Sequence, residues 1–162
     1  MKHICFLSIG SNLGDRFLNI HNSISILSSS FDILETSSFY QTEAWGYKDD
    51  YYINCVVKME TKLNPLFLLE KLILIEKMMG RIEKDTAQYK ARLIDLDILF
   101  YDDAIIDVDI LKIPHPKLYD RNFVLVPLNQ IAPNFKCPVT NKNISELLGE
   151  CSDESKISLH TY

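Results

Sequence analysis

The sequence has few of the features that mark secreted, membrane-spanning or zinc-binding proteins. Its four cysteines are widely spaced and form no C-x-x-C pair, so we expect buried free thiols and neither disulfides nor a zinc site. No run approaches the ~18 apolar residues of a membrane span. The start, MKHICFLSIG, has one lysine and too short an apolar run for a signal peptide. These absences predict a protein of the reducing cytoplasm.

An excess of positive charge is also absent. The formal net charge of −5 argues against a general binder of nucleic acids or anionic membranes, so an anionic ligand would need a local basic patch. The 162 residues contain no repeat or low-complexity linker. We expect a single domain over residues 1–162, long enough to bury a substantial core.

Apolar periodicity predicts that strands alternate with helices. We expect strands at 3–9, 31–45, 51–61 and 93–101, with a last strand at 156–160. We expect helices at 15–29 and 65–79, and shorter helices in FVLVPLNQIAP and ISELLGE. Asn64-Pro65 favours the start of the second helix, and Gly80 its end. The order β-α-β-β-α-β predicts an α+β fold with a ferredoxin-like core and helices packed on a mixed sheet.

Two carboxylates interrupt the apolar run in ARLIDLDILFYDD, residues 91–103. Side chains alternate across a strand, so Asp95 and Asp97 share one face, roughly 6–7 Å apart, while Leu96 and Ile98 face a core. Two like charges in a partly buried environment cost free energy unless a cation neutralises them. Mg²⁺ favours such a pair together with phosphate oxygens, as in phosphoryl-, nucleotidyl- and glycosyltransferases. A polar edge strand is the alternative, but it should alternate more cleanly.

Basic residues gather on both sides of the carboxylates, although the chain is acidic overall. Arg81, Lys84, Lys90 and Arg92 precede the pair, and His115, Lys117 and Arg121 follow it. A polyphosphate needs this combination of cations and metal. Residues 81–91 lack a core-facing stripe and predict a loop that closes as a lid. Asp102-Asp103 predicts a hairpin into AIIDV.

Other motifs are less specific. GSNLGD lacks the Lys-Ser/Thr of a Walker A sequence, and we interpret Gly10 and Gly14 as a strand-to-helix turn. Pro114 and Pro116 restrict the backbone around His115, although a structural loop would explain that pattern as well. Asn54 is unusual inside a strand, and beside Tyr52 it suits the edge of a flat heterocycle stacked on an aromatic ring.

Together these stretches resemble the 6-hydroxymethyl-7,8-dihydropterin pyrophosphokinases of folate biosynthesis. The resemblance runs over about residues 4–133, through IGSNLGDR, SSFYQTEAWG, YYINCVV, IEKMMGR, RLIDLDILFY, IPHPKLYDRNFVLVPL and IAP. It implies transfer of pyrophosphate from ATP to the pterin hydroxymethyl group with release of AMP, two Mg²⁺ ions, and a three-layer α/β/α sandwich with a mixed, mainly antiparallel sheet on the ferredoxin-like core.

The resemblance assigns roles to individual residues. It implies that Asp95 and Asp97 bind Mg²⁺ and that Arg81 and Arg92 act on the phosphates. It places Glu76, Arg92, His115 and Arg121 at the ATP site, where we expect Lys84 to take the place of an arginine that is common in the family. It places Thr42, Trp45, Tyr52, Asn54, Asp95 and Phe123 at the pterin site, with Tyr52 and Phe123 on the ring faces. No residue is assigned as a general base.

The chain also departs from the family pattern. Ile82-Glu83 follows Arg81 where Arg-x-Arg is common, and Tyr89-Lys90-Ala91 replaces Trp-Gly-Pro before Arg92. A ferredoxin-like binding module without catalysis, or another two-carboxylate Mg²⁺-dependent nucleotidyltransferase, is therefore an alternative. We expect small-molecule substrates, no nucleic acid or membrane partner, and a monomer.

Overall fold

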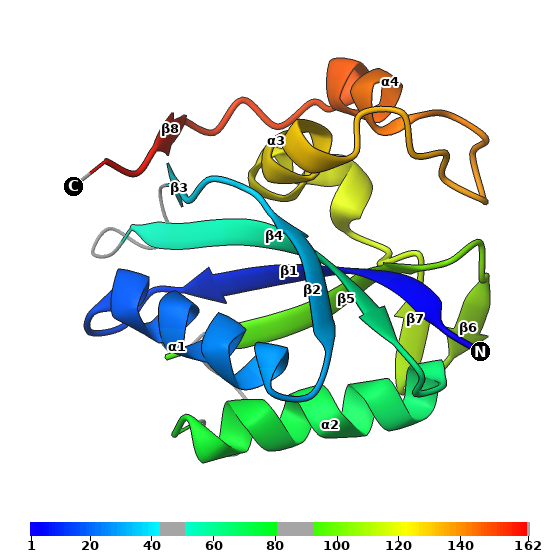
Figure 1. The fold of residues 1–162 in the computed structure, drawn as a ribbon. Helices are drawn as coiled ribbons and strands as arrows, with labels where there is room; N and C mark the ends of the chain where they lie inside the picture. Colours follow the sequence, from blue (N-terminus) through cyan, green and yellow to red (C-terminus); the bar gives the residue numbers. More distant parts are fainter. Residues whose placement is uncertain (43–50, 81–92, 162) are drawn as a thin grey trace.

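The computed structural model describes residues 1–42, 51–80 and 93–161 (Figure 1). Its strands are β1 (His3–Ser11), β2 (Asp32–Thr36), β3 (Tyr40–Thr42), β4 (Tyr52–Thr61), β5 (Asp95–Tyr101), β6 (Ile106–Val108), β7 (Leu111–Ile113) and β8 (Ile157–Leu159). Its α-helices are α1 (Arg16–Ser28), α2 (Pro65–Met78), α3 (Asn122–Ile131) and α4 (Ile144–Glu150), and a short 3₁₀ helix spans Leu118–Asp120.

A six-stranded sheet organises the fold. Its order is β5-β1-β4-β3-β8, and β2 also pairs with β4. Every pairing among these described strands is antiparallel. The sheet and its helices confirm the predicted α+β fold. The sheet was predicted to be mixed but mainly antiparallel, and the described strands contain only antiparallel pairs.

Helices cover both faces of the sheet. In Figure 1, α1 and α2 lie below it, and α3 and α4 lie above it. Alternate residues of β1 point to opposite faces of the sheet. Cys5, Leu7 and Ile9 belong to the core between the sheet and helices α1 and α2. Phe6 joins the second core, which α3 and α4 supply with Leu125, Leu128 and Leu147 among others. One sheet therefore separates two apolar layers.

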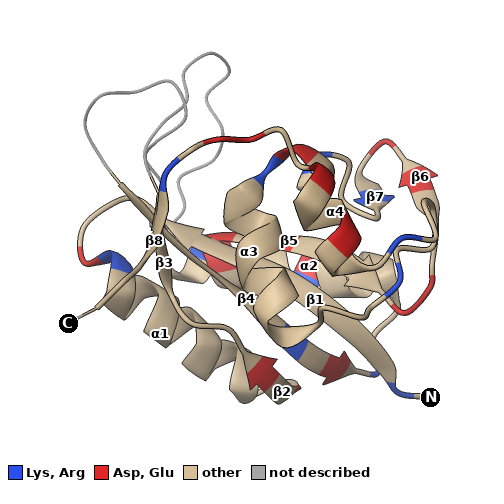
Figure 2. Cartoon of the chain, turned by 90° about the horizontal axis from the view of Figure 1, so that it is seen from above, with Lys and Arg blue, Asp and Glu red and all other residues tan. Residues whose placement is uncertain are grey.

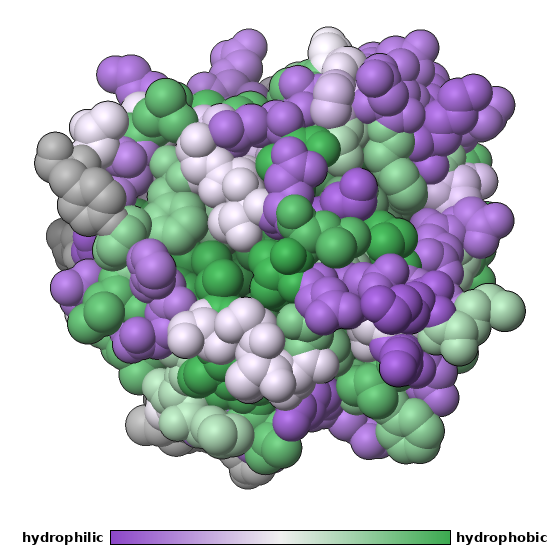
Figure 3. All heavy atoms as spheres, viewed as in Figure 1, coloured by the Kyte–Doolittle hydropathy of each residue, from purple (hydrophilic) through white to green (hydrophobic). Residues whose placement is uncertain are grey.

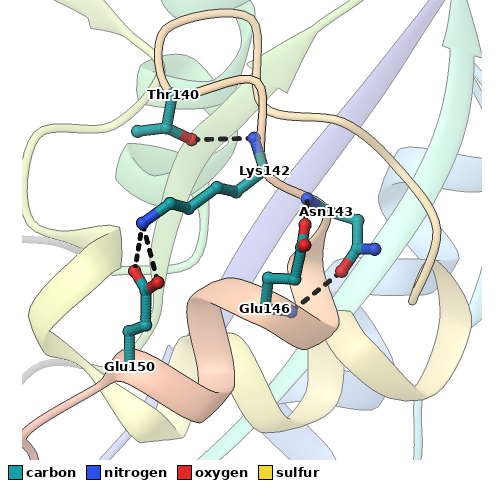
Figure 4. Close-up of polar contacts among 5 residues, drawn as sticks. All are labelled: Thr140, Lys142, Asn143, Glu146 and Glu150. Carbon is teal, nitrogen blue, oxygen red and sulfur yellow. Dashed lines mark hydrogen bonds and ion pairs between the residues drawn. The ribbon is translucent and has the colours of Figure 1, made fainter.

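The helix ends follow the chemistry of their sequence. The Asn64 side chain accepts from the Phe67 N–H at 3.0 Å and begins α2 as predicted. At α4, Asn143 and Glu146 form a reciprocal capping box, drawn in Figure 4. Beside it, the Lys142 ammonium binds both carboxylate oxygens of Glu150 at 2.7 Å. These contacts fix α4, from which the chain continues into its last strand.

One predicted strand is divided in the structure. Residues 31–45 form β2 and β3, with 43–50 outside the described residues. Between the two strands, the Ser37 hydroxyl accepts from the Val56 N–H at 2.9 Å, while the Ser37 N–H donates to the Val56 oxygen. A side-chain oxygen thus takes part where a backbone ladder would continue, and the strand is interrupted.

The hairpin predicted after β5 is also wrong. Strand β6 pairs with β7 in a separate two-stranded ribbon. Asp102 adopts φ 44 and binds the start of β1, accepting from the Ile4 N–H at 2.7 Å and donating its own N–H to the Ile4 oxygen. Because this turn is held against β1, the chain leaves the sheet before β6.

The surface shows where charge and apolar area lie. Figure 2 shows acidic residues on α4, β2 and β6. Helix α2 exposes Phe67, Leu74 and Met78 along one side, where they form an apolar stripe. Figure 3 shows apolar atoms along the lower margin, where Figure 1 draws α2, and across the middle of the same face.

The four cysteines are free thiols. Burial raises the pKa of the Cys5 and Cys55 thiols far above the ordinary value, so both stay protonated. Within the described ranges, no helix is long and apolar enough to cross a membrane.

Candidate active site

A cavity opens at one end of the sheet, on the face that α3 covers. It encloses ≈ 80 Å³ and is bordered by β1, β3, β4, β5, the segment before α3, and α3 itself. Its lining residues are Ser8, Gly10, Thr42, Tyr52, Asn54, Asp95, Asp97, Leu99, His115, Arg121, Phe123 and Val124. Residues from distant parts of the sequence therefore converge on one small volume.

Strand register explains this convergence. Gly10 of β1 pairs with Asp95 of β5 on one side and with Asn54 of β4 on the other. Ser8 pairs with Asp97, and Asn54 also pairs with Tyr40 of β3. Directly paired residues point to the same face of a sheet, so the acid pair and the amide share one platform.

The acid pair has a buried anchor behind it. Asp95 is half-buried and Asp97 is exposed. Between them, the Leu96 N–H donates to Glu76 Oε1 at 2.8 Å. Glu76 belongs to α2, is 3% exposed and is not part of the cavity lining. A carboxylate in the helix layer thus fixes the strand segment that presents Asp95 and Asp97.

The amide of Asn54 is fixed by close contacts. Its Nδ2 donates to Thr42 Oγ1 at 3.1 Å, and both residues are buried. A Cβ at Gly10 would lie 2.7 Å from Asn54 Oδ1, so this close approach requires glycine at position 10. Gly10 therefore lies within β1 and is not the turn residue that the sequence reading expects. Gly14, at φ 64, does fit the predicted turn.

His115 and Arg121 bring imidazole and positive charge to the other side of the cavity. The His115 N–H donates to the Leu99 oxygen at 3.0 Å, and its Nδ1 accepts from the Lys117 N–H at 3.1 Å. The neutral ring therefore carries its proton on Nε2. The Arg121 guanidinium lies over the Phe123 ring, 5.5 Å from the ring centre.

Burial is the main reason that the pKa of His115 lies below its ordinary value. The Asp97 charge raises this pKa, whereas the charges of Arg121 and Lys117 lower it further. The net direction is downward, so the ring is neutral at neutral pH. In this form Nε2–H is available as a hydrogen-bond donor.

Comparison with known protein families shows the family to which the chain belongs. The family model described as 7,8-dihydro-6-hydroxymethylpterin-pyrophosphokinase (HPPK) matches residues 6–133. The chain belongs to the HPPK family. The matched range contains every residue that lines the cavity.

Individual HPPK relatives agree with this assignment. The chain is 38% identical over 146 residues to the 2-amino-4-hydroxy-6-hydroxymethyldihydropteridine pyrophosphokinase of Aquifex aeolicus, covering 90% of each. It is 44% identical over 138 residues to the Folic acid synthesis protein FOL1 of Dictyostelium discoideum, covering 85% of this chain. The chain spans only 21% of that longer protein.

A solved structure supports the fold. Wild-type HPPK-DHPS of Plasmodium falciparum matches with a TM-score of 0.73 at 19% identity, over 93% of this chain and 41% of that one.

The HPPK cavity gathers most of the predicted site residues. Its lining includes Thr42, Tyr52, Asn54, Asp95, Asp97, His115, Arg121 and Phe123. Glu76 lies behind β5. Trp45, Arg81, Lys84 and Arg92, as well as the predicted loop at 81–91, fall outside the described residues. The sequence reading missed Ser8, Leu99 and Val124. Ser8 was detectable, because it is a small polar residue between the core residues Leu7 and Ile9 of β1. Leu99 and Val124 are apolar core residues and gave no such signal.

The donor set fits Mg²⁺ as a ligand shared with a substrate. Among the described residues, no group of three or more His, Cys, Asp or Glu side chains could hold a metal by itself. Mg²⁺ usually takes one or two carboxylates, and waters and phosphate oxygens complete its shell. Asp95 and Asp97, on neighbouring same-face positions of β5, provide such a pair.

Proposed function

We propose that this chain transfers pyrophosphate from ATP to 6-hydroxymethyl-7,8-dihydropterin in folate biosynthesis. The hydroxymethyl oxygen would bond the β-phosphorus as the bond between that phosphorus and the AMP oxygen breaks, and the hydroxyl proton would pass to water. The observation that carries the proposal is the cavity of an HPPK-family chain in which Asp95 and Asp97 lie beside Asn54 and Tyr52.

The pterin would occupy the side of the cavity formed by β3, β4 and the start of α3. Tyr52 and Phe123 provide aromatic faces for a flat heterocycle. The Asn54 amide, held by Thr42, offers a fixed hydrogen-bonding edge. Such pre-oriented polar groups give specificity because a wrong ligand leaves them unpaired.

The triphosphate would lie against the acid pair and the basic side chains. Asp95 and Asp97 would hold Mg²⁺, two ions with ATP, which neutralise the phosphate charge that develops during transfer. Arg121 and His115 line the same cavity, and the Arg121 guanidinium and the His115 Nε2–H would bind phosphate oxygens. Catalysis would then rest on positioning and charge stabilisation.

The remaining assignments stay predictions. We also propose that Arg81, Lys84 and Arg92 act on the phosphates. In the same proposal, Trp45 lies at the pterin and Glu76 acts at the ATP site. So do the three-layer α/β/α sandwich with a ferredoxin-like core, a single domain over 1–162, a monomer and a cytoplasmic location. The sheet order β5-β1-β4-β3 supports the ferredoxin-like label.

Product analysis tests the reaction. With MgATP and 6-hydroxymethyl-7,8-dihydropterin, we expect AMP and the pterin diphosphate in equal amounts. ADP would indicate a simple kinase, and free pyrophosphate a nucleotidyltransferase. Binding of both substrates by calorimetry without any AMP would support the non-catalytic module. Each of these three outcomes rejects the proposed reaction.

A further inference from the structure

Residues 151–160 form an extended segment, here called the strap, that the proposed function leaves without a role. Its burial alternates. Cys151, Asp153, Ser155 and Ile157 are half-buried, whereas the residues between them are exposed. Figure 1 shows the strap leaving α4, passing above α3 and reaching β3 as β8. The alternation indicates one side held against the protein.

The strap is attached first at the start of α3. This helix has Arg121 as its N-cap residue, without a side-chain capping bond. Asp153 Oδ2 accepts from the Asn122 N–H at 3.0 Å, across 31 positions of sequence. Asn122 Nδ2 donates in return to the Asp153 oxygen at 3.1 Å and to the Ser155 oxygen at 2.7 Å. A distant carboxylate thus caps the helix.

The capping carboxylate is itself held in place. Asp153 Oδ1 accepts from both the N–H and the hydroxyl of Ser155. Burial acts to raise the pKa of Asp153, but hydrogen bonds from Ser155 and Asn122 lower it more strongly, and the net pKa is below the ordinary value. The group is therefore ionised at neutral pH, which suits a helix N-terminus.

The position that Asp153 binds is flanked by two cavity residues. Asn122 lies between Arg121 and Phe123, which both line the cavity. The strap occupies the Asn122 backbone N–H and the side-chain Nδ2, so the backbone of this turn is fixed from outside. The conformation of that backbone determines the directions of the Arg121 and Phe123 side chains.

The strap is attached a second time at β3, on the same side of the cavity. In the β3–β8 pairing, Thr42 lies opposite Ile157. The His160 N–H donates to the Phe39 oxygen at 2.8 Å, just before β3. Thr42 in turn binds Asn54, so this attachment also ends at a cavity residue.

We propose that the strap positions the pterin side of the cavity, with Asp153 as a positioning residue that sets Arg121 and Phe123 through Asn122. The inference deepens the proposed function and rests on it. Both attachments reach residues assigned to the pterin, Phe123 and Thr42, while only one reaches a residue assigned to ATP. Release of the strap should therefore weaken pterin binding more than nucleotide binding.

The test compares Asp153→Ala with Glu154→Ala in the full chain. Glu154 is the exposed neighbour, so its removal deletes the same charge without touching α3. We expect Asp153→Ala to raise the pterin Kd about tenfold and the Kd of a MgATP analogue less, measured by calorimetry. Glu154→Ala should change neither. Asp153→Asn keeps one acceptor oxygen for the Asn122 N–H and should restore part of the affinity.

A ligand-free readout accompanies the binding data. Amide hydrogen exchange at Asn122 and Phe123 should accelerate in Asp153→Ala and not in Glu154→Ala. Asn122→Ala removes the two side-chain bonds to the strap, so its effect on pterin Kd should not add to that of Asp153→Ala. Additive effects of the two substitutions on the pterin Kd would mean that the residues act separately, and they would overturn the proposed positioning role of the strap.

The outcomes separate the strap from the reaction. Loss of thermal stability in Asp153→Ala with unchanged Kd for both ligands would make the strap merely structural and overturn the proposal. A wild-type protein that binds both substrates but releases no AMP rejects the proposed reaction, while the pterin Kd ratio still decides the strap. A wild type that binds neither substrate overturns both.

Discussion

The two faces of the same sheet differ at one end. On the face that α1 and α2 cover, Cys5, Leu7 and Ile9 of β1 are all apolar. Under α3 and α4, the apolar series stops after Phe6, and Ser8 and Gly10 line the cavity instead. The backbone is shared, so residue type alone makes one face a core and the other a site.

The same change occurs on the neighbouring strands at the same level. On β4, buried Val56 gives way to Asn54, and on β5 the core pair Leu99 and Phe100 gives way to Asp97. A carboxylate is costly to bury without a partner, so it belongs where the covering helix ends and a cation or solvent can reach it. The difference between the faces predicts that stability and chemistry can be changed separately.

Removing one carboxylate should cause the largest effect on chemistry. We expect Asp97→Asn to lower the rate of AMP release by about 100- to 1,000-fold, because a charge that holds Mg²⁺ against the phosphates is lost. The free energy of unfolding should not fall, since Asp97 is exposed. Asp109→Asn, an exposed acid between β6 and β7, is the matched control. Equal rates in the two variants would contradict the metal assignment.

The opposite face should respond in the opposite way. Leu72 of α2 is fully buried in the core under the sheet. We expect Leu72→Ala to lower the free energy of unfolding by about 2–5 kcal/mol, measured by urea denaturation. The KM values for both substrates should stay unchanged at a temperature where the variant is folded. A large change in KM would show that the two faces are not separable.

A single methyl group at the border between strands should act selectively. Gly10→Ala would bring a Cβ to 2.7 Å from Asn54 Oδ1 and displace that amide. We expect the pterin Kd to rise about 10- to 100-fold while the affinity for a MgATP analogue stays constant. Gly149→Ala is the control, because nothing lies within 4 Å of its added Cβ. An unchanged pterin Kd would contradict the assignment of Asn54 to the pterin site.

Glu76 connects the two faces, and two variants can separate its charge from its hydrogen bond. Glu76→Ala leaves the buried Leu96 N–H without this acceptor, which should cost about 1–3 kcal/mol of unfolding free energy. Glu76→Gln keeps an acceptor oxygen and should lose less. Glu70→Ala, exposed on the same helix, controls for helix effects. If Gln and Ala destabilise equally, the charge matters more than the bond.

The smallest effect concerns pH. In the ligand-free protein, the pKa of His115 lies below its ordinary value of 6.5, so the unfolded chain binds more protons in that window. Its contribution to the free energy of unfolding therefore rises with pH through the window and is complete above about pH 7.5. Denaturation of wild type and His115→Gln between about pH 5 and 8 should show a shallower slope in the variant. Equal slopes would mean that burial does not shift this group.

The sequence predicts much of the site because its chemistry is local. Asp95-x-Asp97 in an apolar run and Asn54 inside a strand both violate strand preferences, and both line the cavity. Helix α2 was predictable because Asn64 and Pro65 determine its start within a few residues. In each case a short segment contains the whole signal.

What the sequence did not predict depends on distant partners. The break between β2 and β3 requires Val56 opposite Ser37, and the loss of the hairpin after β5 requires Ile4 opposite Asp102. Gly10 looked like a turn residue because Asn54, which demands its small size, lies 44 positions away. The contact between Asp153 and Asn122 was likewise not predictable from a local pattern, because the two residues lie 31 positions apart.

A crystal structure with Mg²⁺, a non-hydrolysable ATP analogue and 6-hydroxymethyl-7,8-dihydropterin tests the central claim most directly. The account predicts ion density between the carboxylates of Asp95 and Asp97, in contact with the phosphates, and the pterin ring between Tyr52 and Phe123. Both ligands bound with no ion at the acid pair, or the nucleotide on another face of the sheet, would contradict it.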